Sequence, residues 1–397
     1  MRVAYYNHTS AVSGAEINLM VTAKHYTKAH PIIFAPEGEL LDRARKDWFE
    51  VVPLPSYNAR LSRNPFRLAA GAAGMVRAGY QLAKAAAEQK ADVIHANSLR
   101  AGMMASLFYW RHRIPVVWHL HDIPPKGLIG KTIRLYASLA AQSVIAISEP
   151  VMRDYKKLGN RVHLVHNGTV LSEYTEKEKA YSREKIRTEL NTPQEGRVMT
   201  IIGQIAPWKR QADAIRALHA LLEEGKESYL WIVGEPKFRE ENERYLEELH
   251  LLAEQLKVEK YVRFTGFRED IDEVCCAADL LLLCSENEPF GRVIIEAMAQ
   301  GTPVVATSGG GVSEIIQHGQ SGMLYATGNI LELVHRIKAI EGDKQLYKQI
   351  SMNSMDRIKE HFSIEQAAAK TEQIYRQAIN GVLGKAEELR QSKGVAK

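Results

Sequence analysis

The sequence has few cysteines and no long uncharged apolar run. Only three of its 397 residues are cysteine, and they are clustered, which excludes a disulfide framework or a metal-binding knuckle. The segment from Ile129 to Ile147 comes nearest to a membrane span, but it carries two basic residues. Because the chain opens directly on the strand-like segment Arg2–Tyr6, we expect no signal peptide. Together these features predict a protein of a reducing compartment, the cytoplasm.

Signatures of several nucleotide-binding and nucleic-acid-binding classes are also missing. The chain has no Gly-x-Gly-x-x-Gly fingerprint and no Walker-type phosphate loop, so the usual dinucleotide and P-loop sites are not supported. It has no recognisable nucleic-acid-binding motif, and we expect no nucleic-acid partner. With 45% hydrophobic and 25% charged residues, the composition is that of an ordinary globular protein and excludes wholesale disorder.

The formal net charge of +5 is unevenly distributed. Up to Thr188 the chain has 27 Lys and Arg against 15 Asp and Glu, and from Glu189 onward it has 25 against 32. An asymmetry of this size predicts two bodies with different neighbours. The basic half is suited to phosphate or to an anionic membrane surface.

Short apolar runs alternate with helical patterns along the whole chain, as in Arg2–Tyr6, Pro115–His119, Val198–Gly203 and Leu280–Cys284. Strict alternation of strands and helices predicts parallel sheets with helices on both faces. We therefore predict an α/β protein of two doubly wound, Rossmann-like domains, residues 1–185 and 186–363. A polar linker is expected within residues 171–196 and a frayed tail over residues 381–397.

Ligands of open parallel sheets bind beyond the carboxyl ends of the strands, so two facing sheets would form one cleft between the domains. In the first domain, a turn of small residues around Gly14 follows the first strand and opens a helix. Backbone N–H groups at such a helix start suit a phosphate. A plain capped loop is the alternative.

An apolar strand in the first domain ends in imidazoles and a carboxylate, at His119, His121 and Asp122. The two histidines share one face if the strand continues, because side chains alternate along a strand. The pair could bind a metal, but no third ligand is evident. A second interpretation is a structural histidine. The favoured interpretation is a histidine that binds a polar substrate in the cleft.

In the second domain, Lys209 and Arg210 follow a strand and precede a helix. Cations are electrostatically disfavoured at a helix start, so their position favours an anionic ligand over two solvated charges. Further along, Glu288 lies in a loop after a very apolar strand, and Glu296 lies in the following helix. Their spacing of eight residues is too long for a shared proton and predicts two contacts along one hydroxyl-rich ligand. A later run of three glycines, residues 309–311, fits a structural turn at least as well as a ligand contact.

These motifs resemble the retaining glycosyltransferases of family 4, also called glycosyl transferases group 1, which have the GT-B fold. The segment from Glu288 to Ala306 is similar to the family's Glu-x7-Glu signature and its continuation, and the resemblance extends over the chain to about Asn380. It implies two domains facing across a cleft and a C-terminal helix, residues 364–380, that returns to the N-terminal domain. It also implies an enzyme that moves a sugar from a nucleotide-diphosphate sugar to a glycan or lipid-linked acceptor.

The resemblance assigns roles by position. It implies three catalytic residues: His121 near the transferred sugar, Lys209 at the diphosphate, and Glu288 at the sugar hydroxyls. Glu296 is expected to bind the ribose, and the backbone near Phe267 is expected to meet the base. The full expected donor-binding set is Gly14, Gly203, Lys209, Arg210, Phe267, Phe290, Gly291 and Glu296.

The sequence departs from the family pattern at two positions. Gln204 stands where the family usually has arginine, so one diphosphate cation is missing and Arg210 is the candidate to replace it. Ser13 stands in place of the first glycine of the usual pair before the first helix, which affects how closely the backbone approaches phosphate.

The implied chemistry needs no cofactor and no metal, because Lys209 and helix N-termini can stabilise the departing diphosphate. A two-carboxylate glycosidase scheme is disfavoured, because no carboxylate is an evident nucleophile. A sugar-nucleotide 2-epimerase and a non-catalytic nucleotide-sugar-binding subunit remain alternatives.

The first domain also has a basic and aromatic segment around Arg60, Arg63 and Arg67. Basic side chains beside aromatic ones favour an anionic membrane interface. We therefore expect peripheral attachment to the inner face of the cell membrane. A solvated loop is the alternative.

Overall fold

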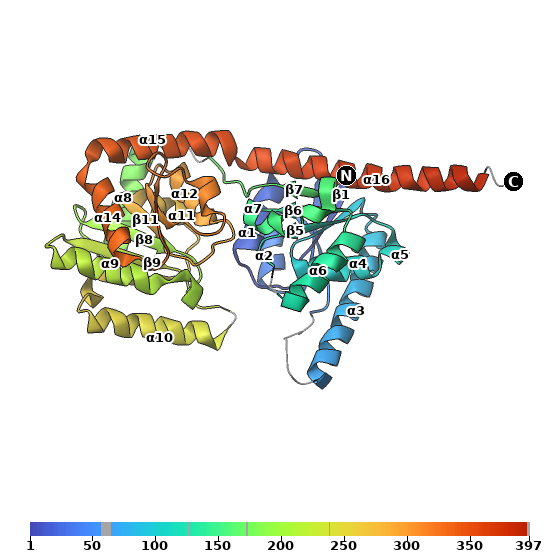
Figure 1. The fold of residues 1–397 in the computed structure, drawn as a ribbon, viewed down its shortest axis with the longest axis horizontal. Coiled ribbons are helices and arrows are strands. Elements are labelled where there is room, and N and C mark those ends of the chain that lie inside the picture. The colour runs from blue at the N-terminus through green and yellow to red at the C-terminus, as the bar shows by residue number, and fades with distance from the viewer. Residues whose placement is uncertain (57–64, 125–126, 172–173, 238, 395–397) are drawn as a thin grey trace. The chain divides into compact units, whose positions relative to one another are not determined.

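The computed structural model describes residues 1–56, 65–124, 127–171, 174–237 and 239–394. The chain divides into two compact units (Figure 1): unit 1 comprises residues 1–168 together with the chain from residue 364 onward, and unit 2 comprises residues 169–363. The division falls after Gly168, earlier than the expected boundary after residue 185, because the segment that follows packs into unit 2.

Unit 1 is built on a seven-stranded parallel sheet with the order β3-β2-β1-β4-β5-β6-β7. Its strands are β1 (Arg2–Tyr6), β2 (His30–Ala35), β3 (Glu50–Pro53), β4 (Val93–Ala96), β5 (Val116–Leu120), β6 (Ser143–Ala146) and β7 (Val162–Leu164). The order of the strands reverses between β1 and β4, which makes that pair the topological switch point. In sheets of this kind ligands bind beyond the carboxyl ends of the strands at such a point.

The helices of unit 1 come from both ends of the chain. They are α1 (Gly14–Lys24), α2 (Glu39–Lys46), α3 (Pro65–Glu88), α4 (Leu99–Leu107), α5 (Tyr109–His112), α6 (Gly127–Ala140), α7 (Glu149–Arg153) and α16 (Ile364–Gly394), with a 3₁₀ helix over Lys156–Arg161. The backbone of α16 is helical to Gly394, whereas the sequence predicts a frayed tail after residue 380.

Helix α16 is part of the core of unit 1. Its buried Tyr375 and Ile374 pack in the same apolar cluster as Tyr5 and Leu19. The carboxylate of Glu372 accepts hydrogen bonds from the backbone N–H groups of residues 27, 28 and 29, at 3.0, 2.6 and 2.7 Å. These N–H groups end the loop after α1, so the last helix of the chain fixes the entry into β2.

Unit 2 repeats the plan with a six-stranded parallel sheet in the order β10-β9-β8-β11-β12-β13. Its strands are β8 (Arg197–Ile202), β9 (Ser228–Val233), β10 (Val262–Gly266), β11 (Leu280–Leu283), β12 (Val304–Thr307) and β13 (Met323–Tyr325). The switch point lies between β8 and β11. Every residue of β11 is buried, as expected for a central strand covered on both faces.

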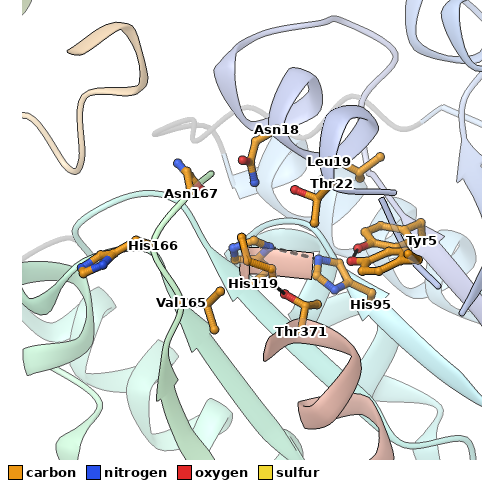
Figure 2. A pocket seen from close by; sticks show the side chains of 12 residues that line it. Tyr5, Asn18, Leu19, Thr22, His95, His119, Val165, His166, Asn167 and Thr371 are labelled. Carbon is orange, nitrogen blue, oxygen red and sulfur yellow. Dashed lines mark hydrogen bonds between the residues drawn. The ribbon is translucent and has the colours of Figure 1, made fainter. Parts of the chain in front are cut away.

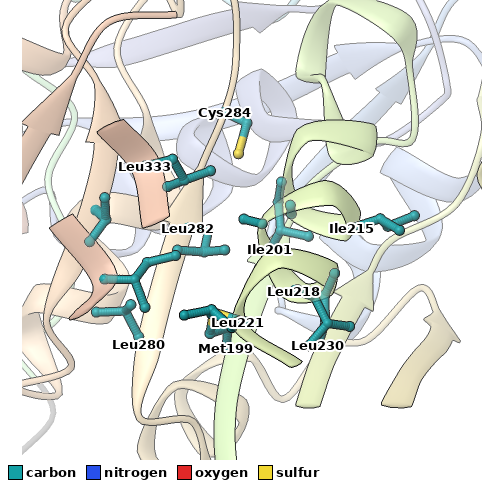
Figure 3. Packing of buried hydrophobic residues seen from close by; sticks show 14 of the residues in the cluster. Met199, Ile201, Ile215, Leu218, Leu221, Leu230, Leu280, Leu282, Cys284 and Leu333 are labelled. Atoms are coloured by element: carbon teal, nitrogen blue, oxygen red, sulfur yellow. The ribbon is translucent and has the colours of Figure 1, made fainter. Parts of the chain in front are cut away.

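Eight α-helices surround this sheet within the described residues: α8 (Glu176–Glu189), α9 (Gln211–Glu223), α10 (Glu240–Gln255), α11 (Ile271–Ala277), α12 (Arg292–Ala299), α13 (Val312–Ile315), α14 (Ile330–Gly342) and α15 (Lys344–His361). Short 3₁₀ helices cover Pro207–Lys209 and Glu259–Tyr261. On one face of the sheet, side chains of β8 and β11 interdigitate with those of α9 and α14 (Figure 3), as Ile201, Leu218, Leu282 and Leu333 illustrate.

The polar segment expected as a linker is instead a helix of unit 2. Thr175 and Glu178 form a capping box that starts α8, and the helix packs on α11. The Arg187 side chain is fully buried: its guanidinium donates to the carbonyl oxygens of Ala277 and Gly196, at 3.0 and 2.6 Å, and pairs with Asp279. A buried arginine saturated by carbonyl groups cannot be distinguished from a solvated one by composition, which is why the sequence pattern indicated a linker.

None of the helices formed by the described residues has the length and apolar character needed to cross a membrane.

Candidate functional site

The switch point of unit 2 brings together Gly203, Lys209 and Glu288. Gly203 follows β8, Lys209 ends the 3₁₀ turn after it, and Glu288 lies in the loop after the adjacent β11. The ammonium of Lys209 donates to the Glu288 carboxylate at 2.7 Å, and the two side chains are only 17% and 9% exposed. A charged pair sheltered at strand ends is costly to desolvate, so it must be supported by its surroundings or used by a ligand.

Two positions at the strand ends near Lys209 require glycine. Gly203 has φ +145°, and an added Cβ there would lie 3.8 Å from the Lys209 ammonium. On the neighbouring strand end, an added Cβ at Gly234 would lie 1.9 Å from the carbonyl oxygen of Gly203. The backbones after β8 and β9 can approach this closely only without side chains.

The three glycines of residues 309–311 hold the backbone of Glu288. The N–H of Gly311 donates to the Glu288 carbonyl at 2.8 Å. Gly310 has φ +68°, and a Cβ there would lie 1.9 Å from the same oxygen. This run is therefore a structural turn that positions the Glu288 loop. Gly291, with φ +100°, caps α12, while Phe290 is buried beside it.

Trp208 is a neighbour that sequence reasoning did not single out. The Lys209 ammonium lies 4.3 Å from the centre of its indole ring, within the range of a cation–π contact. The Trp208 carbonyl accepts the N–H of Glu286 at 2.8 Å, which ties the loop after β8 to the loop after β11. An aromatic residue directly before the basic pair was the available signal.

The helix start does not leave its two cations unpaired, contrary to the electrostatic reason for expecting an anion there. Arg210 donates to Asp213, in the first turn of α9, at 2.6 Å, and this hydrogen bond raises the pKa of Arg210. Lys209 has Glu288. Local carboxylates therefore neutralise both cations, and Arg210 points to Asp213.

Glu296 lies on α12 and pairs with Arg292 one turn earlier. Its charge, together with burial as the larger cause, raises the pKa of Asp272 on α11. Glu288 and Glu296 thus have separate cationic partners within the protein, and their two contacts along one ligand stay a prediction. The role of Glu296 toward ribose stays a prediction.

One Asp-x-Asp sequence, Asp270-Ile271-Asp272, needs attention because that spacing can hold a metal ion. The Arg268 guanidinium pairs with the Asp270 carboxylate at 2.5 Å. The hydrogen bond from Arg268 lowers the pKa of Asp270. Asp272 accepts a hydrogen bond from Gln300 at 3.2 Å. Among the described residues, no group of three or more histidine, cysteine or acidic side chains could hold a metal ion.

Gln204, which stands in place of the family's usual arginine, makes a neutral contact. Its side-chain amide donates to the Lys237 carbonyl at 2.9 Å. The Lys237 ammonium lies 4.9 Å from the ring centre of Phe267 and pairs with Glu235 at 3.0 Å. Phe267 is 40% exposed. Lys237 thus connects Gln204 to Phe267, which lies in the segment expected to meet the base.

In unit 1, the first loop presents an open helix start. Gly14 is the first residue of α1, and Ser13 forms a capping box with Glu16. An added Cβ at Gly14 would meet nothing within 4 Å, so there is open space where a side chain at this position would lie. The Ser13 cap already occupies one of the free N–H groups.

The next two strand ends of unit 1 place Asn97 and His121 in contact. Asn97 follows β4, His121 follows β5, and the His121 Nε2 lies 2.9 Å from the Asn97 Oδ1. Asn97 is 1% exposed and also reaches Asn7, after β1, at 3.2 Å. Sequence reasoning found His121 but missed both asparagines, although each directly follows a buried strand.

His119 is the buried member of the histidine pair. Its ring lies 4.2 Å from that of His121, so the two share one side as predicted. His119 Nδ1 lies 3.1 Å from His95 Nε2, and His95 Nδ1 lies 2.8 Å from the Tyr375 hydroxyl. Burial holds the pKa of both His95 and His119 well below the ordinary value. His119 therefore matches the structural interpretation.

A small cavity of about 10 Å³ adjoins this network (Figure 2), and it is lined by Asn18, His119, Asn167 and Thr371 among others. Its lining residues come from strands β1, β4 and β5, from α1 and the loop after it, from the segment after β7 and from α16. It therefore lies where the chain leaves unit 1 after Asn167 and re-enters it at α16.

The basic and aromatic segment around Arg60, Arg63 and Arg67 falls on residues 57–64 and on a side chain outside the described part of the structure. The membrane prediction made from it therefore stays a prediction.

Comparison with known families and structures identifies the class of protein. The model of Glycosyl transferases group 1 matches residues 182–357, and that of Glycosyltransferase Family 4 matches residues 12–173. Anabaena HepE in complex with UDP-glucose is 26% identical, with a TM-score of 0.80 over 97% of this chain and 100% of that one. A sucrose-phosphate synthase from Thermosynechococcus elongatus, 20% identical, shares the fold with a TM-score of 0.75 over 96% of this chain and 99% of that one.

Curated relatives match shorter stretches. N-acetyl-alpha-D-glucosaminyl L-malate synthase of Bacillus anthracis is 27% identical over 191 residues, 48% of each chain. D-inositol 3-phosphate glycosyltransferase of Streptomyces bingchenggensis is 26% identical over 317 residues, 73% of this chain and 67% of the relative. The chain thus spans about half to two thirds of the length of these relatives.

Two doubly wound parallel sheets, matched along almost their full length by a nucleotide-sugar-bound structure, define a GT-B glycosyltransferase. The two family models together extend over most of the chain. The chain therefore belongs to the family 4 glycosyltransferases, the glycosyl transferases group 1, and it is an enzyme of that class.

Proposed function

We propose that the enzyme transfers a sugar from a UDP-sugar, with retention of configuration and without a metal ion, to a glycan or lipid-linked acceptor. The observation that carries the proposal is the sheltered Lys209–Glu288 pair, 2.7 Å apart at the switch point of unit 2 and beside Gly203. The bound UDP-glucose in Anabaena HepE supports the choice of donor. Two lipopolysaccharide core biosynthesis glycosyltransferases of Rhizobium meliloti, 30% and 28% identical over 45% of this chain, support the acceptor class.

The proposed roles follow from the charges. The Lys209 ammonium neutralises the diphosphate as charge develops on it, while Glu288 holds that ammonium in place and meets the sugar hydroxyls. Glu296, whose charge Arg292 balances, binds the ribose. In this proposal His121 contacts the transferred sugar, and the backbone N–H groups at the helix start around Gly14 bind phosphate.

A donor screen followed by a transfer assay tests the proposal. Thermal shift with UDP-, GDP- and ADP-sugars identifies the donor, and radiolabelled donor with acceptor extract then measures transfer. We expect label to leave the nucleotide, with undiminished rates in EDTA and a product whose anomeric coupling constant matches the donor.

Each other outcome of the donor screen and transfer assay identifies a competing function. Label that stays on the nucleotide with a changed sugar would indicate a 2-epimerase. Tight donor binding without turnover on any acceptor extract would indicate a non-catalytic subunit. Loss of activity in EDTA would overturn metal independence, and an inverted product would overturn retention.

We also propose that unit 1 attaches reversibly to the anionic inner face of the cell membrane. Helix α6 supports this: Leu128, Leu135 and Leu139 are 80%, 63% and 77% exposed, and Lys131 lies on the same helix. Residues 127–140 contain no acidic side chain. Exposed leucines beside basic groups suit an anionic lipid surface.

Vesicle binding tests the attachment. We expect co-sedimentation with anionic but not neutral vesicles, weakened by salt, by the Arg60/Arg63/Arg67→Glu triple change and by Leu135→Ser with Leu139→Ser. Leu331→Ser, which alters an equally exposed leucine of unit 2, is the matched control. Absence of binding to anionic vesicles at low salt would remove the membrane attachment and leave a soluble acceptor.

A further inference from the structure

Three side chains at the switch point of unit 1 form one hydrogen-bonded series. Asn7 follows β1, Asn97 follows β4 and His121 follows β5, and these strands are neighbours in the sheet. Asn97 Nδ2 lies 3.2 Å from Asn7 Oδ1, and Asn97 Oδ1 lies 2.9 Å from His121 Nε2. Asn7 and Asn97 are 0% and 1% exposed, so neither amide can exchange these partners for bulk water.

The direction of every bond in this series follows from one backbone carbonyl. The side-chain nitrogen of Asn7 donates to the Thr9 carbonyl at 2.7 Å, and a carbonyl can only accept. Asn7 therefore presents its Oδ1 to Asn97, and Asn97 must donate a hydrogen bond to it from its NH₂ group. The Asn97 NH₂ also lies 3.5 Å from the carbonyl oxygen of Ala15, a second acceptor that fixes the same orientation.

Asn97 consequently presents its oxygen to His121. An amide oxygen is an acceptor only, so the ring nitrogen that faces it must carry a proton. In the neutral imidazole one nitrogen donates and the other accepts. A proton on Nε2 therefore makes Nδ1 the accepting nitrogen of the ring.

We propose that Asn97 is a positioning residue that holds His121 as the Nε2–H tautomer and so fixes the orientation of the imidazole that the proposed function places at the transferred sugar. The consequence for transfer rests on the proposed function of His121, whereas the tautomer itself does not. Asn97 is anchored by the loop from Thr9 to Ala15, which surrounds Gly14. The same network therefore fixes the imidazole relative to the helix start expected to meet phosphate.

The tautomer is measured directly by two-dimensional ¹⁵N–¹H spectra of protein labelled at its histidine ring nitrogens, with His121→Gln used to assign the signals. We expect the Nε2–H pattern for His121 in the wild type near neutral pH. Asn97→Leu, which keeps the volume but removes the acceptor, should give a mixture of tautomers. Asn18→Leu removes a similarly buried amide on α1, and it should leave the pattern unchanged.

An Nδ1–H pattern in the wild type would overturn the assignment, and so would an unchanged pattern in Asn97→Leu. If Asn97→Leu does not fold, Asn97→Asp provides the test, because a carboxylate also accepts from Nε2 but stabilises the protonated ring. An opposite charge at this distance raises a pKa by about 1–3 units. The pH at which the ring signals of His121 titrate should rise by that amount in Asn97→Asp.

A purely structural role for Asn97 would instead leave the titration of the His121 ring signals unchanged in Asn97→Asp, and that result would also overturn the inference. The proposed function fails separately. If Asn97→Leu mixes the tautomers while the transfer rate stays at the wild-type value, the tautomer assignment stands and the role of His121 in transfer is wrong.

Discussion

The switch points of the two sheets are built with different chemistry. In unit 2 the strand ends carry charges that pair locally: Lys209 with Glu288, Arg210 with Asp213. In unit 1 they carry neutral amides and imidazoles, Asn7, Asn97 and His121, linked into one series. A charged side chain that is paired within the protein can exchange its partner for a charged ligand. A series of neutral hydrogen bonds instead fixes the orientation of the groups that it joins. Under the proposed function, unit 2 would supply electrostatic stabilisation and unit 1 would supply orientation.

Removing the positive charge of Lys209 in unit 2 should have the largest effect on the transfer rate. Lys209→Ala is expected to lower kcat by about 10²-fold or more, because a preorganised donor at developing charge contributes that much. The matched control is Lys338→Ala, whose lysine pairs with Glu224 on the surface. The transfer rate at saturating donor measures the change in kcat, and thermal unfolding measures the change in stability. Turnover within a few-fold of wild type would show that Lys209 does not meet the diphosphate.

Separating the two glutamates sharpens the assignment within unit 2. Glu296→Ala should weaken UDP and UDP-sugar binding alike, by about tenfold for a lost charge-assisted hydrogen bond. Glu288→Ala should impair sugar transfer while UDP binding stays nearly the same, because UDP has no transferable sugar. Calorimetry with UDP measures the difference. Equal losses of UDP affinity in both variants would sink the two-contact assignment.

Three histidines near the switch point of unit 1 should make the stability of this unit depend on pH. Burial lowers the pKa of His95 and His119 well below 6.5, and burial with the nearby Arg100 lowers that of His8 to about 4. Below pH 6.5 the unfolded chain therefore binds protons that the folded unit excludes, so its stability falls as pH falls.

Each of these three histidines should contribute up to about 1.4 kcal/mol per pH unit to the loss, with the contribution of His8 ending near pH 4. Urea unfolding between about pH 7.5 and 5 measures the slope. His119→Phe should reduce it, whereas a slope unchanged by this substitution would show that His119 is charged in the folded state.

The smallest effect is expected at Gln204, where unit 2 lacks the family's usual arginine. Gln204→Arg should leave activity intact or raise it a few-fold, since it adds a cation near Lys209. The loss of the bond to the Lys237 carbonyl costs about 1 kcal/mol. Activity and denaturation curves measured together separate the two effects. A folded but inactive variant would mean that the donor site is arranged differently here.

Much of this protein could be predicted from its sequence because the signals are local. Alternating apolar runs placed the strands of both sheets, since a buried parallel strand is nearly all apolar. The Glu288–Glu296 segment identified the family, because its residues follow one another in the chain. The loop after β8 contributes Lys209 in the same way.

Where the sequence misled, a long-range contact was decisive. The polar segment before β8 was expected as a linker, but α8 buries Arg187 under carbonyl groups supplied by distant loops. The two basic residues at the start of α9 were expected to need an anion, but the distant Glu288 neutralises Lys209, and Arg210 pairs with Asp213 three residues further on. Charge patterns along the chain do not reveal which partner folds against them.

The sequence by itself determined the two doubly wound sheets, the family and the charged residues after β8 and β11, because periodicity and contiguous motifs encode these features. Only the tertiary structure decided that Lys209 faces Glu288, that Tyr375 reaches His95, and that Asn97 turns its oxygen to His121. Each of these contacts joins residues far apart in the chain. The direction of an amide depends on which donors and acceptors the folded sheet places around it, and no local pattern carries that information.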